Sequence, residues 1–378
     1  MEEQIISKEI DYLREAVILL RIVSGSDNMA RLEKRILSAI GKPTDRIRQI
    51  LQLLKDIVQE AQERFQEQKK EIDYYFQCDE HTSLTAGDMV LLYENCPSAA
   101  PGKEVEQLRL FWQSLDEESY YGQFGECLTA YESGLDALEH PKALTDPMEI
   151  LRTILKLNIP EEEKWKLQQI FLEPQKHREQ VLPLLQGTVS LLHGHDRKIA
   201  PLTEEFYLFW SRTLEHTDIY DYIQENLGSA LGKCQWGTVI RPQLMRPGTL
   251  GMQLKTQRGA FVPSPAYCWI GILYGEDLAI RSVLDGEEGN RQEIALYALK
   301  LLSDKSKFEI LAYIRNRQAY GTELARQFGL TTATISHHMS TLVGEGLVEV
   351  TREDNKVFYR SRTEALRSIL EYCLETLT

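Results

Sequence analysis

The sequence has few cysteines, no long apolar run and no clustered metal-binding motif. Its six cysteines in 378 residues form no CxxC pair, so they fit neither a disulfide framework nor a zinc site. No run of 18 apolar residues occurs, and the first residues, MEEQIISKEIDYLREAV, carry acids where a signal peptide needs a basic start. We therefore expect a cytoplasmic protein with free thiols and no membrane partner. The cysteines are Cys78, Cys96, Cys127, Cys234, Cys268 and Cys373.

The short motifs of common enzyme classes are also missing. The chain has no GxGxxG, GxxxxGK[ST] or HExxH sequence, and the serine of Gly228-Ser229-Ala230-Leu231-Gly232 stands one place too early for a nucleophile elbow. The one compact group of metal-binding residue types is His193-Gly194-His195-Asp196, which we interpret as an exposed turn. We therefore expect no enzyme activity, no catalytic residue, no metal and no cofactor.

The charge is unevenly distributed along the chain. The net charge is −14, yet residues 291–378 carry 12 Lys and Arg against 11 Asp and Glu, whereas the residues before them carry 31 against 46. A near-neutral tail on an acidic body is compatible with a DNA-binding module that relies on a few placed cations.

Residues 1–235 are expected to be mainly helical. Apolar residues recur at helical spacing from Asp45 to Phe76, which predicts one long amphipathic helix. The pattern of residues 84–130 predicts no particular element. Five further helices are predicted, at 147–157, 162–172, 177–192, 203–214 and 217–231.

The pattern changes at Trp236, where short β-rich runs alternate with Pro and Gly. We expect a small β-containing subregion at 236–284 within the same domain, a linker at 285–290, and a second domain at 291–378. The predicted fold class is mainly α: a large helical N-terminal domain with a small β-containing subregion, followed by a C-terminal winged helix-turn-helix.

The C-terminal prediction begins with two amphipathic helices. They are expected at 292–302 and 304–316, and Ser303 is placed to cap the second through its hydroxyl. Residues 321–328 predict a short third helix that ends at Gly329, a residue type suited to left-handed backbone.

A fourth helix and a hairpin complete this domain. Thr331 is expected to cap the helix TATISHHMSTLVGE, whose Ile335, Met339 and Leu342 face inward, and Leu330 is expected to be buried in the turn before it. Two β-rich runs on either side of a polar turn at 352–355 then predict a hairpin, which after a helix-turn-helix forms a wing.

Residues 297–361 resemble the ArsR family of winged-helix transcriptional repressors. LKLLSDKSKFEIL is similar to the family's second helix, GTELARQFGLTTATISHHMSTLVGEGLV to its helix-turn-helix, and TREDNKVFYR to its wing. The resemblance implies double-stranded DNA as a partner, with a recognition helix in the major groove. The residues expected to contact DNA are Thr332, Thr334, Ser336, His337, Arg352, Lys356 and Arg360.

The resemblance does not extend to metal sensing. Adjacent helical positions such as His337 and His338 diverge by about 100° and do not readily bind one ion together. The family's metal sites use a Cys-rich third helix or a His, Asp and Glu set on the last helix. Here the third helix has no cysteine, and the last has a single Cys373 and no histidine.

The last helix carries an apolar stripe that is large for so small a domain. We expect it to form a symmetric homodimer over an inverted-repeat operator; the alternative is packing against the N-terminal region of the same chain. The predicted dimerisation residues are Leu366, Ile369, Leu370, Cys373 and Leu377.

Two functions follow from this organisation. The favoured one is a one-component transcriptional regulator, a repressor, whose N-terminal domain binds a small-molecule effector. The alternative is an enzyme or scaffold protein that carries the winged helix as a protein-interaction or regulatory module. The tryptophans all lie between residues 112 and 269, where they either line a ligand pocket or, as we favour, pack in the core.

Overall fold

The computed structural model describes residues 4–278 and 298–374, apart from short internal gaps. These gaps are residues 28, 41–42, 78–84, 93–101, 134–143, 158, 228–233, 235, 254–255, 258–259, 262–263, 277, 345–346, 354–355, 364–365, 368 and 371–372. The linker predicted at 285–290 and most of the helix predicted at 292–302 lie outside the described residues, and residues 298–302 are helical. Among the described helices, none combines the length and apolarity needed to cross a bilayer.

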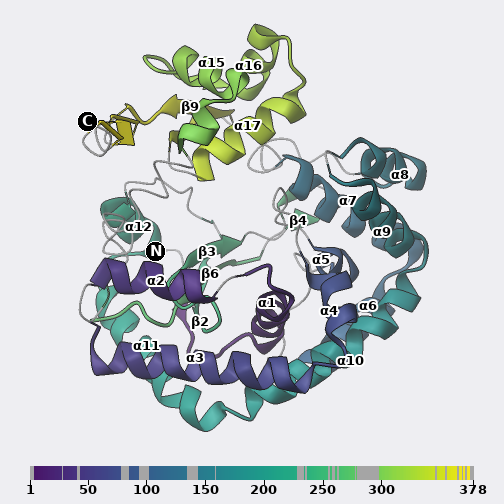
Figure 1. The fold of residues 1–378 in the computed structure, drawn as a ribbon, viewed down its shortest axis with the longest axis vertical. Coiled ribbons are helices and arrows are strands. Elements are labelled where there is room, and N and C mark those ends of the chain that lie inside the picture. The colour runs from purple at the N-terminus through teal and green to yellow at the C-terminus, as the bar shows by residue number, and fades with distance from the viewer. Residues whose placement is uncertain are drawn as a thin grey trace.

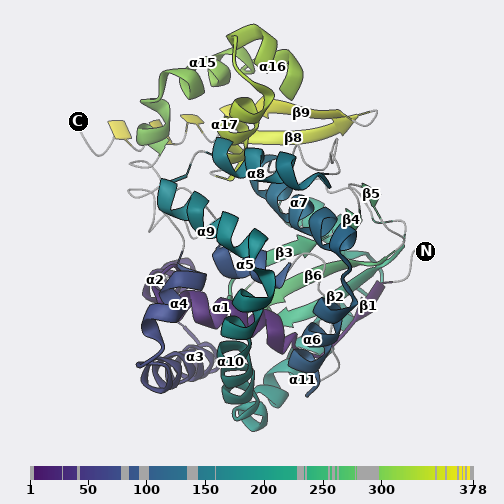
Figure 2. The ribbon, with the colours of Figure 1, turned by 90° about the vertical axis from the view of Figure 1, so that its right-hand side faces the viewer.

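The N-terminal part is mostly helical and surrounds a small sheet (Figure 1). Its helices are α1 (Tyr12–Ser24), α2 (Met29–Ile40), α3 (Asp45–Arg64), α4 (Lys69–Phe76), α5 (Ala86–Leu91), α6 (Glu104–Ser114), α7 (Glu117–Ser133), α8 (Pro147–Lys156), α9 (Glu161–Leu172), α10 (Pro174–His193), α11 (Asp196–Thr213) and α12 (Ile219–Leu227). All five helices predicted after residue 146 are present, within a few residues at most ends. Figures 1 and 2 show α3, α10 and α11 on the side away from the C-terminal part.

The single long helix predicted for residues 45–76 is wrong. The chain forms α3 and α4, separated by Phe65–Gln68, although no Gly or Pro marks the break. Phe65 is buried, and the turn that follows it re-aims the chain so that Ile72 and Phe76 of α4 are fully buried. Tertiary packing therefore outweighs the local helical preference here.

A mixed sheet has strand order β1-β2-β6-β3. Strand β1 runs parallel to β2 with Gln4 opposite Thr238, β2 runs parallel to β6, and β3 is antiparallel to β6. This confirms a β-containing subregion after Trp236, but the short β1 was not predicted. The strands are β1 (Gln4–Ile6), β2 (Thr238–Gln243), β3 (Leu250–Gln253) and β6 (Ala266–Gly271), with β4 (Thr256–Gln257) and β5 (Ala260–Phe261) forming a separate pair.

Helix α1 lies at the centre of the N-terminal core. Eleven of its thirteen residues are buried, the pattern of a helix covered on all sides. It begins where Asp11 accepts a hydrogen bond from the Arg14 N–H, and it ends at Gly25, whose φ of 92° is left-handed. Helices α3, α4 and α10 pack around it.

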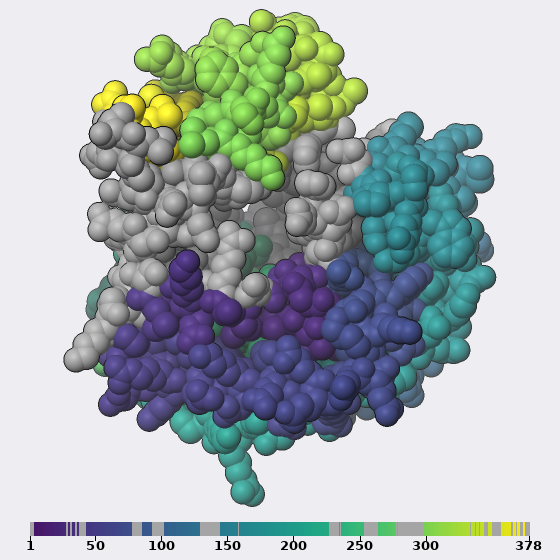
Figure 3. Space-filling view, viewed as in Figure 1, coloured from purple at the N-terminus to yellow at the C-terminus, as the bar shows by residue number. Residues whose placement is uncertain are grey.

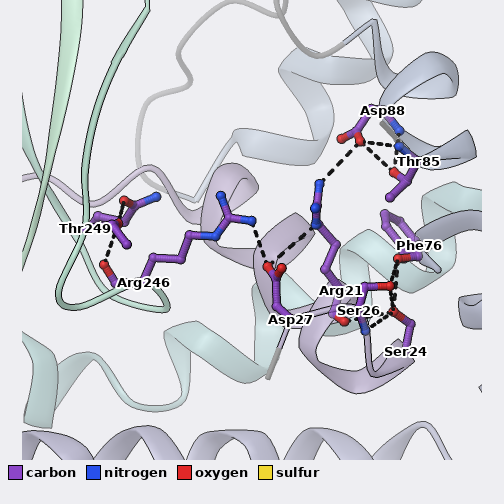
Figure 4. Close-up of polar contacts among 10 residues, drawn as sticks. Arg21, Ser24, Ser26, Asp27, Phe76, Thr85, Asp88, Arg246 and Thr249 are labelled. Carbon is purple, nitrogen blue, oxygen red and sulfur yellow. Dashed lines mark hydrogen bonds and ion pairs between the residues drawn. The ribbon is translucent and has the colours of Figure 1, made fainter. Parts of the chain in front are cut away.

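A charged network ties the end of α1 to two distant segments (Figure 4). Asp27 lies 2.8 Å from Arg246 Nη2 and 3.6 Å from Arg21 Nε, and Arg21 Nη1 lies 3.6 Å from Asp88 on α5. Beside it, the Ser24 and Ser26 hydroxyls donate to the carbonyl oxygen of Phe76. The contacts fix the turn after α1 against α4, α5 and the loop after β2.

Glu15 is a buried acid that attaches α1 to the chain beyond β2. Its carboxylate oxygens accept hydrogen bonds from the Leu244 N–H at 2.8 Å and the Met245 N–H at 2.6 Å. Burial raises the pKa of Glu15 to about 7, and the two N–H bonds only partly oppose this rise.

Replacing Glu15 by Gln should therefore change how N-terminal stability depends on pH. The stabilisation of the folded state by Glu15 is complete below pH 4.5, the pKa of this carboxyl in the unfolded chain. It is lost as the pH rises through about 7, its pKa in the folded chain, by at most about 1.4 kcal/mol per pH unit. The stability of wild type relative to Glu15→Gln should fall from pH 5 to pH 8. Urea unfolding followed by tryptophan fluorescence measures it, and parallel profiles would contradict the assignment.

Candidate nucleic-acid interface

A helix-turn-helix is present where the sequence predicts it. Helix α16 (Gly321–Phe328) ends at Gly329, whose φ of 65° is left-handed, and the Leu330 N–H returns to the Ala325 carbonyl oxygen at 3.0 Å. A side chain at that φ is strained, which accounts for the glycine. Leu330 is half-buried and packs against the C-terminal core.

Helix α17 (Thr332–Gly344) follows directly. The Thr331 hydroxyl accepts a hydrogen bond from the Thr334 N–H at 3.1 Å and lies 2.8 Å from the Thr334 hydroxyl. This confirms the predicted cap. Ile335, Met339 and Leu342 have no exposed surface, so one face of α17 is committed to the domain core.

The cap predicted at Ser303, for the helix that precedes the helix-turn-helix, lies one residue later in the structure. Helix α15 (Lys305–Tyr313) is capped by Asp304, whose carboxylate accepts from the Lys307 N–H at 2.9 Å. That hydrogen bond to the charged form lowers the pKa of Asp304. Ser303 instead donates to the Lys300 carbonyl oxygen at 2.6 Å, because it still belongs to the turn that ends the preceding helix.

A three-stranded sheet forms the predicted wing. Strands β8 (Val348–Glu353) and β9 (Lys356–Ser361) are antiparallel, and β7 (Ala319–Tyr320), which was not predicted, pairs with β9. Val357 and Tyr359 point into the core, whereas Arg360 is exposed, with its Nε 3.9 Å from Glu349 Oε1.

The residues expected to contact DNA have different exposures. Thr332 is exposed, Thr334 is half-buried and Arg360 is exposed; the side chains of His337, Arg352 and Lys356 lie outside the described residues. Ser336 is 3% exposed and does not present its hydroxyl in this arrangement. It follows Ile335 and stands three positions before Met339, so it lies at the edge of the core-facing stripe.

The predicted dimer stripe is divided in two. Leu366 and Ile369 pack against the C-terminal core, whereas Leu370 is 45% exposed and Cys373 is half-buried. Leu377 lies outside the described residues, and Leu374 is 62% exposed.

Helix α17 is turned towards the N-terminal part. Figures 1 and 2 both show it on the side of the C-terminal part that faces residues 4–278, with α15 and α16 beyond it. The Cα atoms of α17 and α7 come within 8 Å of each other. In the space-filling view the green C-terminal atoms stand above the purple and blue atoms of the N-terminal helices (Figure 3). Helix α17 therefore has part of the N-terminal region beside it.

The segment His193-Gly194-His195-Asp196 forms the turn between α10 and α11, with Gly194 and Asp196 exposed and the two histidines half-buried. His193 Nε2 lies 3.1 Å from Glu104 Oε1, His193 Nδ1 lies 3.1 Å from Asp196 Oδ2, and the Tyr12 hydroxyl donates to Asp196 Oδ1. These contacts join α1, α6 and the turn. Within the described part of the chain, no three or more His, Cys, Asp or Glu residues form a metal-binding group.

Thr331→Ala should destabilise the C-terminal part by about 1 kcal/mol, because the first turn of α17 loses its cap. Amide hydrogen exchange of residues 332–344 measures the effect without relying on tryptophan, which this part lacks. The control is Thr332→Ala, an exposed neighbour whose hydroxyl is not the cap. Equal exchange rates in the two variants would contradict the role given to Thr331.

Comparison with known proteins agrees with this geometry. Residues 304–350 match the family described as bacterial regulatory protein, arsR family. The arsenical resistance operon repressor of Staphylococcus aureus is 34% identical over 73 residues, which are 19% of this chain and 70% of that protein. The corresponding repressor of Staphylococcus xylosus is 37% identical over 68 residues, 18% of this chain and 65% of that protein.

Among solved structures, reduced HlyU from Vibrio cholerae N16961 is 27% identical, covering 22% of this chain and 88% of that chain, with a TM-score of 0.20. These similarities involve about a fifth of the chain. Through its C-terminal helix-turn-helix, the chain belongs to the ArsR family of bacterial regulatory proteins.

Proposed function

We propose that this protein is a transcriptional repressor that binds operator DNA as a homodimer and whose N-terminal part binds an effector. The observation that carries the proposal is the match of residues 304–350 to a family of regulatory proteins, on a segment folded as a capped helix-turn-helix. Two relatives are named repressors, which supports repression here. The proposal assigns no catalytic step to either part.

The DNA contacts would come from the start of α17 and from the wing. Thr332 and Thr334 stand in the first turn of α17, where the helix dipole favours phosphate and short polar side chains meet base edges. Arg360 projects from the wing as an exposed cation suited to the phosphate backbone. Base contacts determine sequence preference, whereas phosphate contacts determine overall affinity.

The effector is proposed to be a small molecule bound by the N-terminal part. Residues before 291 are far more numerous than a winged helix requires, and they form their own hydrophobic core. Arsenic is not part of the proposal, because the helix-turn-helix itself carries no cysteine and because, within the described residues, no three or more His, Cys, Asp or Glu residues form a group that could hold a metal ion.

DNA binding is tested by gel shift with the DNA upstream of the gene. Specific binding should appear and weaken steeply with salt. Thr334→Ala should relax sequence preference, whereas Arg360→Ala should lower affinity for all sequences alike and reduce the salt slope by about 1. Absence of specific binding at low salt would refute the proposed function.

The dimer is tested through the exposed leucines at 370 and 374. Leu370→Asp with Leu374→Asp should shift the chain towards monomer in sedimentation velocity, because an apolar dimer contact does not accept buried carboxylates. The matched control is Phe308→Asp on α15, where Phe308 is 56% exposed. A double variant that stays dimeric would place the interface elsewhere.

A further inference from the structure

The most extensive approach between described elements of the two parts is that of α7 to α17. It brings the helix that would read DNA against a helix of the N-terminal part, and both ribbon views show α17 on the side that faces that part (Figures 1 and 2). The contact therefore involves the surface on which the proposed function depends.

The side of α17 available to α7 is limited. Ile335, Met339 and Leu342 are fully buried in the C-terminal core, and α15, α16 and β8 pack on α17 from that side. The part of α17 left for a partner is the part that would enter a groove. A neighbouring helix and a DNA duplex must therefore use overlapping surface.

The size of the major groove makes the two partners mutually exclusive. The groove is about 12 Å wide, and one helix with its side chains is about 10–12 Å across. A second helix on the groove-facing side of α17 has no room to enter the groove with it, and the Cα atoms of α7 lie within 8 Å of α17. DNA can receive α17 only after α7 and α17 have separated.

Helix α7 is firmly held by the N-terminal core. Phe124 and Leu128 are fully buried, and the Phe124 ring lies 4.9 Å from the ring of Phe171 on α9. The Tyr120 hydroxyl donates to the Ile170 and Phe171 carbonyl oxygens, both at 3.2 Å. Separation must therefore move the whole C-terminal part away, since pulling α7 out would disrupt this core.

The N-terminal and C-terminal parts have separate hydrophobic cores. The described buried residues form two hydrophobic clusters, one drawn from residues 10–278 and the other from 298–359, and they share no member. Breaking the α7–α17 contact thus opens neither core. Helix α7 also carries four Glu and no Lys or Arg, so its charge has the same sign as the phosphate backbone that would replace it.

We propose that α7 is an internal competitor of duplex DNA for α17, so that this structure is the closed, non-binding form of the regulator. The inference rests on the proposed DNA-binding function. Apparent DNA affinity is then the intrinsic affinity reduced by the fraction of open chain. A ligand of the N-terminal part represses or releases DNA binding to the extent that it favours one form.

Photocrosslinking of the full-length chain tests the competition. The photoreactive residue p-benzoylphenylalanine is placed at Tyr131 of α7 in one variant and at Thr341 of α17 in another, because neither is an expected DNA contact. Without DNA, irradiation should join residues 117–133 to residues 332–344, as mapped by mass spectrometry. The matched control carries the same probe at the exposed Phe308 of α15 and should not join these two segments.

The second half of the experiment repeats the crosslinking in the presence of DNA. A specific upstream fragment should reduce the α7–α17 crosslink in proportion to the fraction of chain bound, and the crosslinked fraction should shift no DNA although the irradiated Phe308 control does. No crosslink from either probe, or a yield unchanged by bound DNA, overturns the competition alone. A chain that forms the crosslink but never binds specific DNA overturns the proposed function, and the competition falls with it.

Discussion

Helix α17 has one side buried in its own domain, and this leaves a single side for every other partner. Ile335, Met339 and Leu342 fix its orientation over the C-terminal core, and the Thr331 cap fixes where it begins. Helix α7 lies close to α17, and a duplex would have to approach α17 on the surface that the core leaves uncovered. In the regulation proposed above, the two partners compete for that surface and neither part changes its fold.

The N-terminal part is held together by contacts between α1 and distant segments of the chain. Helix α1 runs through its core, Glu15 joins it to Leu244 and Met245, and the Arg21–Asp27 network joins its end to α5 and to Arg246. The connections to Leu244, Met245 and Arg246 join residues more than 200 positions apart in the sequence. Helix α5, which this network reaches, in turn packs against α7.

The sequence reveals the C-terminal domain well because its signals are local. Gly329 marks a left-handed turn and Thr331 a cap, and each acts within four residues of itself. Predictions fail where distant packing decides. The break after Arg64 has no local signal, and β1 is three residues long and exists only because Thr238–Ile240 pairs with it. Ser336, a predicted DNA contact, is 3% exposed, and no local signal in the sequence reveals that burial.

Helix α7 is an element that the sequence pattern did not predict. Its apolar residues Tyr120, Phe124 and Leu128 have helical spacing, yet Gly122 and Gly125 interrupt the pattern and argue against a helix. The structure explains Gly125: a Cβ there would lie 2.0 Å from the Leu144 carbonyl oxygen. A glycine required for close approach was therefore indistinguishable, in the sequence, from a glycine that breaks a helix.

The parallel pairing of Gln4 with Thr238 also sets an order of events during synthesis. The first strand has no partner until the chain has grown by 234 residues, so the sheet closes late. At about 5–20 residues per second, the ribosome makes the last residue of α17 roughly 4 to 15 seconds after Gly271 completes the sheet. The residues of α17 are therefore synthesised only after every residue of α7 and of the four-stranded sheet is available to fold.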